Sequence, residues 1–333
     1  MKIAGSLATL ALAVGSTLVL PNTATAATCT WSSSTLSGPA GAFSTIHATD
    51  NSGGWAGTAY FSFVGNHVIA WKNGTITDYG EIGSSSANVV VVDENRTGAL
   101  AVNVTDGGEA QTKSEYRISG GQWQQLAPLP GGTRPEVVSI NDAGDVYGTT
   151  QMVNGSGITG TVVVRWPANQ ATPVQVAGLP FDTTMIDLDD DGTLLVGTPD
   201  PKTGGPVPHL LRNGILTALP PLANGQTTNG DAIANGRVAG DVITKSIQLI
   251  GTVWESNLAV HSLPNLQEGM LINRNDLVVG TLTGSGATNG VWRNGTLEYS
   301  FGSTSNYVAL GAVSDDGTFG GDINSVPTVW RCS

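Results

Sequence analysis

The sequence predicts an all-β protein folded as a seven-bladed β-propeller, with four antiparallel strands per blade and the N-terminal strand completing the last blade. Three observations support this prediction. The composition favours short strands and tight turns, a unit of 40 to 48 residues recurs along the chain, and the two cysteines lie near its two ends.

The composition excludes several classes of protein. Of 333 residues, 45 are glycine and only 12% are charged, and we find no stretch that combines helical spacing of apolar residues with a helix-start signal. This composition is typical neither of helical nor of disordered chains. The formal net charge of −12 argues against a nucleic-acid partner, because phosphate backbones repel an acidic protein.

Residues 1–26 have the pattern of a cleaved secretory signal peptide. Lys2 precedes an apolar run up to Leu20, and the small residues of Ala24-Thr25-Ala26 precede the predicted cleavage site. The run is too short for a membrane span, and no later apolar stretch approaches its length. We therefore expect a secreted, extracellular monomer with a single domain over residues 27–333 and no membrane segment.

The repeated unit consists of an apolar strand, a polar turn rich in Asn and Asp, and a second apolar strand. It is clearest in the segments VVSINDAGDVYGTTQ, AIANGRVAGDV, MLINRNDLVVGTL and AVSDDGTFGGD. One residue in the turn of each unit serves as an anchor: Gly53, Gly98, Gly144, Gly192, Gly236, Asp276 and Gly317. Consecutive anchors are 45, 46, 48, 44, 40 and 41 residues apart.

The two ends of the chain together supply one further unit. The 16 residues after Gly317 and the 27 from Ala27 to Gly53 make an interval of 43 residues. Later in each unit a third apolar strand leads into a hairpin, for which the pairs Asn73-Gly74, Asn213-Gly214 and Asn294-Gly295 are suited. The spacing therefore predicts a closed ring of four-stranded units.

The last unit ends in TVWRCS, its third strand, and the N-terminal segment CTWSSSTLSGP matches the missing fourth strand. Cys29 and Cys332 then lie where the other blades have a hairpin turn. In an oxidising compartment we expect these two cysteines to form a disulfide that closes the ring.

Tryptophan recurs at the end of the third strand, and we expect these residues to pack between blades: Trp71, Trp166, Trp254, Trp292 and Trp330. Trp55 and Trp123 fall outside this register. They are our candidates for exposed binding residues.

One loop has a partial calcium-binding pattern. Asp187, Asp189 and Asp191 precede Gly192 in a D-x-D-x-D-G arrangement, which lets carboxylates converge on a hard cation. Thr198 stands where a closing Glu is needed, and the same positions elsewhere form a blade turn. A solvated acidic turn is therefore the alternative, and we expect no obligatory cofactor.

The loops that lead into the innermost strands should gather around one opening of the central channel. Six ionisable residues are expected to rim that opening: His47, Arg134, Glu136, Asp182, Asp231 and Glu268. Their spacing defines no acid–base pair, and neither an H-E-x-x-H nor a G-x-S-x-G motif occurs. We predict no catalytic residue.

The segments SINDAGDVYGT, VVVRWP, LINRNDLVVGT and GVWRNG resemble the secreted bacterial HAF-type repeats over essentially the whole mature chain. That resemblance implies a non-catalytic propeller that promotes autolysis of a thermolysin-type neutral metalloprotease. It also implies a glutamine-donor substrate of extracellular transglutaminase. Gln122, Gln124 and Gln125, which surround Trp123, are our candidate donor glutamines.

Two alternatives remain open beside a protein-binding role. A carbohydrate-binding lectin would repeat similar polar and aromatic pockets in several blades, whereas the loops here differ in length and content. A propeller lyase or lactonase would gather a metal or a cluster of His and carboxylates at the channel. The predicted inner strands supply mostly Val, Ile and Ala, so the sequence favours protein binding.

Overall fold

The computed structural model describes residues 29–333 apart from residues 63, 107–111, 224 and 285. The predicted signal peptide therefore lies outside the described residues. No helix in the described part of the chain is long and apolar enough to cross a membrane.

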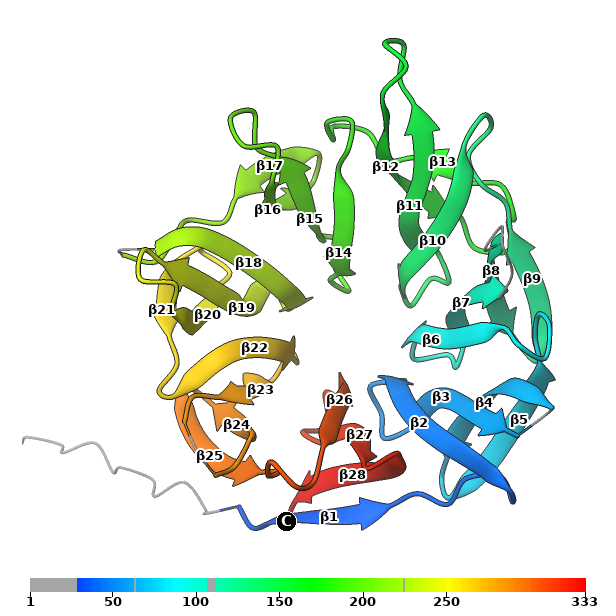
Figure 1. The fold of residues 1–333 in the computed structure, drawn as a ribbon, viewed down its shortest axis with the longest axis vertical. Coiled ribbons are helices and arrows are strands. Elements are labelled where there is room, and N and C mark those ends of the chain that lie inside the picture. The colour runs from blue at the N-terminus through cyan, green and yellow to red at the C-terminus, as the bar shows by residue number, and fades with distance from the viewer. Residues whose placement is uncertain (1–28, 63, 107–111, 224, 285) are drawn as a thin grey trace, which may run out of the picture.

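Seven four-stranded antiparallel sheets stand around a central channel, which confirms the predicted propeller (Figure 1). Blades 1 to 6 follow the chain in order, and blade 7 combines three C-terminal strands with the N-terminal strand β1. Within each sheet the strands follow one another from the channel outward.

The inner strands are β2 (Ala42–Thr49), β6 (Asn88–Glu94), β10 (Thr133–Ile140), β14 (Thr184–Leu188), β18 (Gly225–Ala234), β22 (Leu266–Ile272) and β26 (Val308–Val313). The second strands are β3 (Trp55–Phe61), β7 (Leu100–Asp106), β11 (Val146–Val153), β15 (Leu194–Pro199), β19 (Arg237–Thr244), β23 (Leu277–Leu282) and β27 (Phe319–Ile323). The third strands are β4 (Gly65–Lys72), β8 (Thr112–Ser119), β12 (Thr159–Trp166), β16 (Pro206–Arg212), β20 (Leu249–Trp254), β24 (Asn289–Arg293) and β28 (Val326–Cys332). The outer strands are β5 (Thr75–Glu81), β9 (Gln122–Leu126), β13 (Val174–Gln175), β17 (Ile215–Ala218), β21 (Val260–Ser262), β25 (Thr296–Phe301) and β1 (Trp31–Thr35).

The ring is closed in blade 7 as the sequence predicts. Strand β1 pairs antiparallel with β28, with Trp31 opposite Cys332. Cys29 and Cys332, 303 positions apart, form the disulfide. The bond takes the place of the hairpin that joins the third and fourth strands of the other blades.

The turn after each inner strand explains the repeat. All seven anchor residues have a positive φ, between 60° and 91°, a conformation that glycine adopts at little cost. The Asn that opens several of these turns has two roles. Asn95 Oδ1 accepts a hydrogen bond from Ala99 N at 2.9 Å, and its Nδ2 donates to Asn141 O of the next blade at 2.8 Å. The polar turn therefore both closes its own hairpin and links neighbouring blades.

Tryptophans fill the interfaces between blades. The five that recur on third strands are at most 4% exposed, which confirms their packing role. Trp166 Nε1, for example, donates to Ala127 O at 2.8 Å, on the connector that leads into its blade. The expectation for Trp55 is wrong: it is 2% exposed, because it lies opposite Trp71 on the paired strand and shares its core. Trp123 is partly buried against Tyr116.

The two sides of the ring are named here by its topology. The connector side is the side on which the inner strands begin; it also carries the hairpins between second and third strands. The turn side is the side on which the inner strands end; it also carries the hairpins between third and fourth strands. Antiparallel pairing assigns every hairpin to one of these sides.

Candidate functional site

Each inner strand has a β-bulge at the same place, two or three residues before the strand ends on the turn side. The bulged residues are His47, Val92, Val138, Ile186, Asp231, Met270 and Gly311. A bulge re-aims a side chain and often lies beside a functional site. Since only His47 and Asp231 are ionisable, the wall offers little acid–base chemistry at this level.

A cavity of about 190 Å³ occupies the channel near the turn side, and two of its lining carboxylates have structural partners. Asp93 Oδ2 accepts hydrogen bonds from Ser139 Oγ at 2.5 Å and Ile140 N at 2.9 Å. Asp187 Oδ2 accepts one from Ile233 N at 2.8 Å. Desolvation raises the pKa of Asp93 to about 6 and that of Asp187 to about 7. Both groups therefore join one blade to the next.

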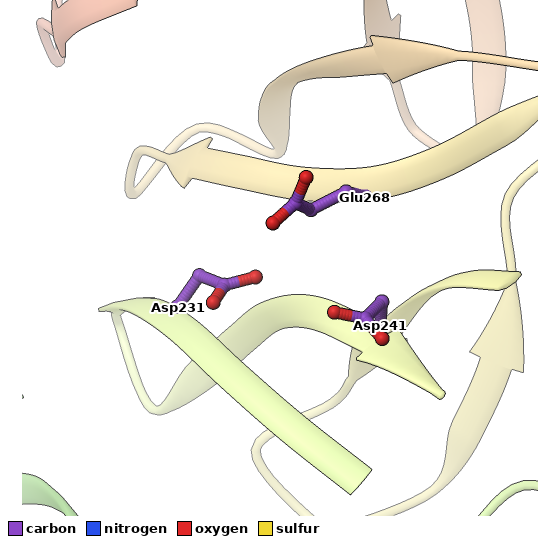
Figure 2. A group of neighbouring side chains, drawn as sticks. All are labelled: Asp231, Asp241 and Glu268. Carbon is purple, nitrogen blue, oxygen red and sulfur yellow. The ribbon is translucent and has the colours of Figure 1, made fainter. Parts of the chain in front are cut away.

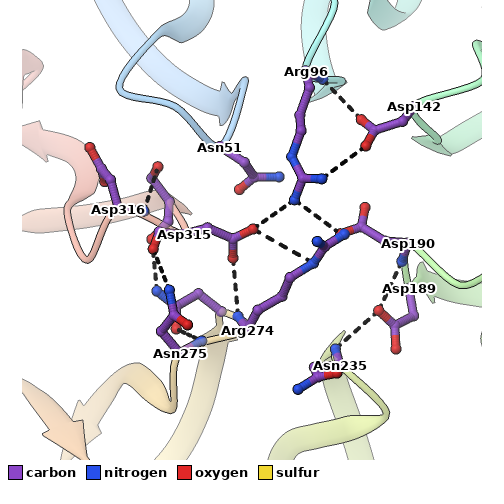
Figure 3. Close-up of polar contacts among 12 residues, drawn as sticks. Asn51, Arg96, Asp142, Asp189, Asp190, Asn235, Arg274, Asn275, Asp315 and Asp316 are labelled. Carbon is purple, nitrogen blue, oxygen red and sulfur yellow. Dashed lines mark hydrogen bonds and ion pairs between the residues drawn. The ribbon is translucent and has the colours of Figure 1, made fainter.

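An ion-pair network lies across the turn-side mouth of the channel (Figure 3). Arg96 contacts Asp142 at 3.2 Å, Asp315 at 2.9 Å and Asp190 at 3.5 Å. Arg274 pairs with Asp190 and, at 3.6 Å, with Asp315. These five residues come from the turns of blades 2, 3, 4, 6 and 7. Both guanidinium groups already pair with aspartates. Neither arginine is therefore free to bind an anionic ligand at this mouth.

The predicted calcium loop is part of the same blade turns. Asp189 accepts hydrogen bonds from Asn235 N at 3.0 Å and Gly236 N at 2.5 Å, both in blade 5. Asp191 instead accepts one from Thr193 N at 2.8 Å, within its own turn. Asp187, Asp189 and Asp191 accept hydrogen bonds from different backbone amides, and within the described residues their carboxylate oxygens do not all lie within 4.8 Å of one another. This geometry is that of a blade turn.

Three other carboxylates do converge. Asp231 on β18, Asp241 on β19 and Glu268 on β22 each have an oxygen within 4.8 Å of the others (Figure 2). The group, which we call the carboxylate cluster, joins blades 5 and 6. Its geometry could hold a cation. Asp231 and Glu268 were predicted at one opening, whereas Asp241 was missed; its signal was a lone charge in the apolar segment VAGDVIT.

Burial makes this cluster electrostatically costly. Desolvation raises the pKa of Asp231 to about 7, and the charges of Asp241 and Glu268 act in the same direction. Desolvation also raises the pKa of Asp241, although Asn229 Nδ2 donates to it at 3.1 Å. Asp231 Oδ2 is buried and accepts no hydrogen bond from the described residues.

Blade packing does not account for Asp241. At the same register in blade 2, Asn103 Oδ1 accepts a hydrogen bond from Val137 N of the next blade at 2.9 Å. In blade 7, Asp322 Oδ1 accepts one from Ile46 N at 3.3 Å. Asp241 makes no such bond to blade 6 within the described residues. Asp241 therefore faces the other two acids without linking blade 5 to blade 6 by a hydrogen bond.

The other predicted rim residues do not form one site. His47 Nε2 lies 2.8 Å from Thr45 Oγ1, and burial lowers the pKa of this imidazole. Asp182 accepts a hydrogen bond from Thr161 N at 3.2 Å. Arg134 and Glu136 are exposed near the start of β10. Of the six residues, only Asp231 and Glu268 are brought together in a cluster of described carboxylates.

The candidate donor glutamines lie on β9, the outer strand of blade 2. Gln122 and Gln125 are exposed, and Gln124 is partly buried. They are therefore at the periphery of the ring, far along the sheet from the channel.

The two sides of the ring differ in chemistry. Of twelve exposed large apolar side chains in the described residues, nine lie on the connector side: Phe43, Tyr60, Val64, Val153, Ile158, Ile247, Leu249, Tyr307 and Val326. Val174 and Ile215 lie on the turn side, and Met270 lies on an inner strand. Eight of the nine arginines lie on the turn side, Arg134 being the exception. The connector side is thus the apolar side and the turn side the charged one.

No family model and no curated protein matches this chain. Among solved structures, it resembles streptogramin B lyase at 16% identity and a TM-score of 0.54, covering 92% of this chain and 98% of that one. It resembles the Pyrococcus horikoshii acylaminoacyl peptidase at 10% identity and a TM-score of 0.60, covering 84% of this chain but only 50% of the peptidase. The β-propeller domain of the Trilobed protease from Pyrococcus furiosus matches at 6% identity and a TM-score of 0.56, covering 77% and 80%. At such identities these similarities establish the propeller fold and nothing beyond it.

Proposed function

We propose that this protein is a secreted, non-catalytic propeller that binds another extracellular protein through its connector side. The observation that carries the proposal is the concentration of exposed apolar side chains there. Ile247 is 86% exposed, Tyr307 74% and Phe43 65%. Clusters of exposed apolar groups mark protein interfaces, and aromatic residues are enriched in them.

Two further features support the proposal. The turn-side mouth is covered by ion pairs between Arg96, Arg274 and three aspartates, which leaves the connector side as the more accessible apolar surface. The Cys29–Cys332 disulfide is consistent with an extracellular location.

The repeat suggests the identity of the partner. Its HAF-type units look most like those of dispase autolysis-inducing protein, so we take a thermolysin-type metalloprotease, whose autolysis this protein would promote, as the first partner to test. Transglutaminase is the second, with Gln122, Gln124 and Gln125 as donors. The exposure of Gln122 and Gln125 on an outer strand supports this assignment, because an enzyme must reach its donor side chain.

The experiment compares two surface variants of the whole protein. The connector-side variant carries Phe43→Ser, Ile158→Ser and Ile247→Ser, and the turn-side control carries Val174→Ser and Ile215→Ser. Both variants replace exposed apolar side chains with serine. We expect the first variant to lose at least about tenfold in protease capture and in acceleration of autolysis, as loss of interface anchors does, and the control to keep both. Equal behaviour of the two variants would refute binding through the connector side.

The carboxylate cluster favours one second candidate, a propeller lyase or lactonase that uses Asp231, Asp241 and Glu268 around a divalent cation. Turnover of lactones by the purified protein with Mg²⁺ or Ca²⁺, lost in Asp241→Asn, would establish it. Under the proposed function, no turnover is expected with either ion.

A further inference from the structure

A second cavity, of about 460 Å³, lies between blades 6 and 7 on the connector side. Its walls include Glu268 and Met270 of β22, Thr281 of β23, and Tyr307 and Leu310 at β26. This volume is within the range of about 300–1,000 Å³ that is usual for ligand pockets.

This cavity has one acidic lining residue among the described residues, beside several neutral polar ones. Glu268 lines it, and the carboxylate of Glu268 also belongs to the carboxylate cluster. Within the described residues, no Lys, Arg or His forms an ion pair with any of the three acids. Thr281 Oγ1, which also lies in the cavity wall, is buried without a hydrogen-bond partner, as is Asp231 Oδ2 of the cluster. A hydrogen-bond donor in the cavity would satisfy Thr281 Oγ1, and a positive charge there would complement Glu268.

The rest of the wall is apolar. Met270 is 37% exposed and Tyr307 is 74% exposed, although both are large apolar side chains. An aliphatic stem could pack against Met270 and Leu310, and the face of the Tyr307 ring could receive a guanidinium group. A bare metal ion would use only oxygen ligands and leave this apolar wall uncovered.

We propose that this cavity receives a basic side chain, arginine or lysine, from the protein partner, an assignment that rests on the proposed function and specifies what the partner presents. The complementarity has two parts: Glu268 for the charge, and Met270, Leu310 and Tyr307 for the stem. Arginine suits it best, because its planar guanidinium binds carboxylates and aromatic faces together.

A small probe tests the cavity without the partner. We expect butylguanidinium to bind the full-length protein, measured by chemical-shift perturbation, and its neutral isostere butylurea to bind at least about tenfold more weakly. Glu268→Gln should weaken butylguanidinium binding to a similar degree, and Tyr307→Ala should weaken it as well. Glu81→Gln, which changes an exposed acid on the connector side of blade 1, should not. Equal binding of the two probes, or Ca²⁺ binding that Glu268→Gln removes without any butylguanidinium binding, would overturn the proposal.

The protease partner separates this inference from the proposed function. If Glu268→Gln leaves both probe and partner binding unchanged while the connector-side variant loses the partner, the cavity assignment is refuted and the function stands. If the probe binds as expected but the connector-side variant still captures the partner, the proposed binding surface is refuted, and the cavity stands only as a site for a basic group.

Discussion

Arg117 shows how single side chains hold neighbouring blades together. It is 3% exposed, and its guanidinium donates to three backbone carbonyls: Gly144 O at 2.7 Å, Pro167 O at 3.0 Å and Gln170 O at 2.7 Å. All three acceptors belong to blade 3, whereas Arg117 is on β8 of blade 2. A buried charge is tolerated here because carbonyl oxygens replace its hydration.

We therefore predict that Arg117→Met lowers the free energy of unfolding by about 2–4 kcal/mol, since three charge-assisted hydrogen bonds are lost and the carbonyls lose their donor. Urea denaturation followed by fluorescence would measure it. Arg331→Met, at an exposed position, is the control and should stay close to the parent protein. A stability equal to the parent's for Arg117→Met would show that the carbonyls do not need this donor.

Strand β1 is the element on which closure of the ring depends. It has five residues and pairs with one strand, β28. The hydrogen bonds of this short pair alone would hold the two ends of the chain together only weakly. The disulfide makes this connection covalent across 303 positions. Loop entropy for a cross-link of this length amounts to about 5–6 kcal/mol as an upper figure.

Cys332→Ser should accordingly lower the melting temperature while far-ultraviolet circular dichroism keeps its strand signal. Cys29→Ser should have the same effect, and the double variant should be no less stable than either single one, because all three lack one bond. Two free thiols in the native secreted protein, found by thiol titration, would contradict the closure.

The sequence of the turn at residues 187–192 suggests a metal-binding site, whereas its hydrogen bonds indicate a structural role. The carboxylates of this turn already accept hydrogen bonds from backbone amides. We therefore expect neither EDTA nor Ca²⁺ to change the melting temperature through this loop. A calcium-dependent rise that Asp191→Asn removes would contradict this.

Several carboxyl groups across the molecule stay protonated at higher pH than an exposed carboxyl would, because burial removes them from water. The pKa values rise to about 6 for Asp93 and Asp322, about 7 for Asp187 and Asp231, and about 8 for Glu94. They belong to blades 2, 4, 5 and 7, and most lie near the channel, where the inner strands crowd together. At these five groups the folded protein thus binds protons more tightly than the unfolded chain does.

The sign of the pH dependence follows. A carboxyl with a raised folded pKa contributes stability that is present below its unfolded pKa, near 4, and lost as pH rises through the folded pKa. We therefore expect the melting temperature to fall between pH 5 and pH 8 at constant ionic strength. Asp322→Asn should flatten this dependence. A melting temperature that rises over the same interval would show that the groups are ionised in the folded state without penalty.

Features with a local cause could be predicted from the sequence. Blade number follows from the repeat, because each turn needs a residue with positive φ at its anchor, which favours glycine at regular intervals. The closing strand and disulfide follow from the same count, since the unit left over at the two ends must be one blade. The burial of the repeated tryptophans follows from their common register.

Features that depend on how neighbouring blades meet were decided only by the tertiary structure. Trp55 is buried because its cross-strand neighbour is Trp71, and Asp241 joins Glu268 because blade 6 places that residue beside it. The ion pairs of Arg96 reach blades 3, 4 and 7, up to 219 positions away. Each of these contacts joins residues whose relative position is set by the twist and packing of whole sheets, and no local pattern of residues encodes that geometry.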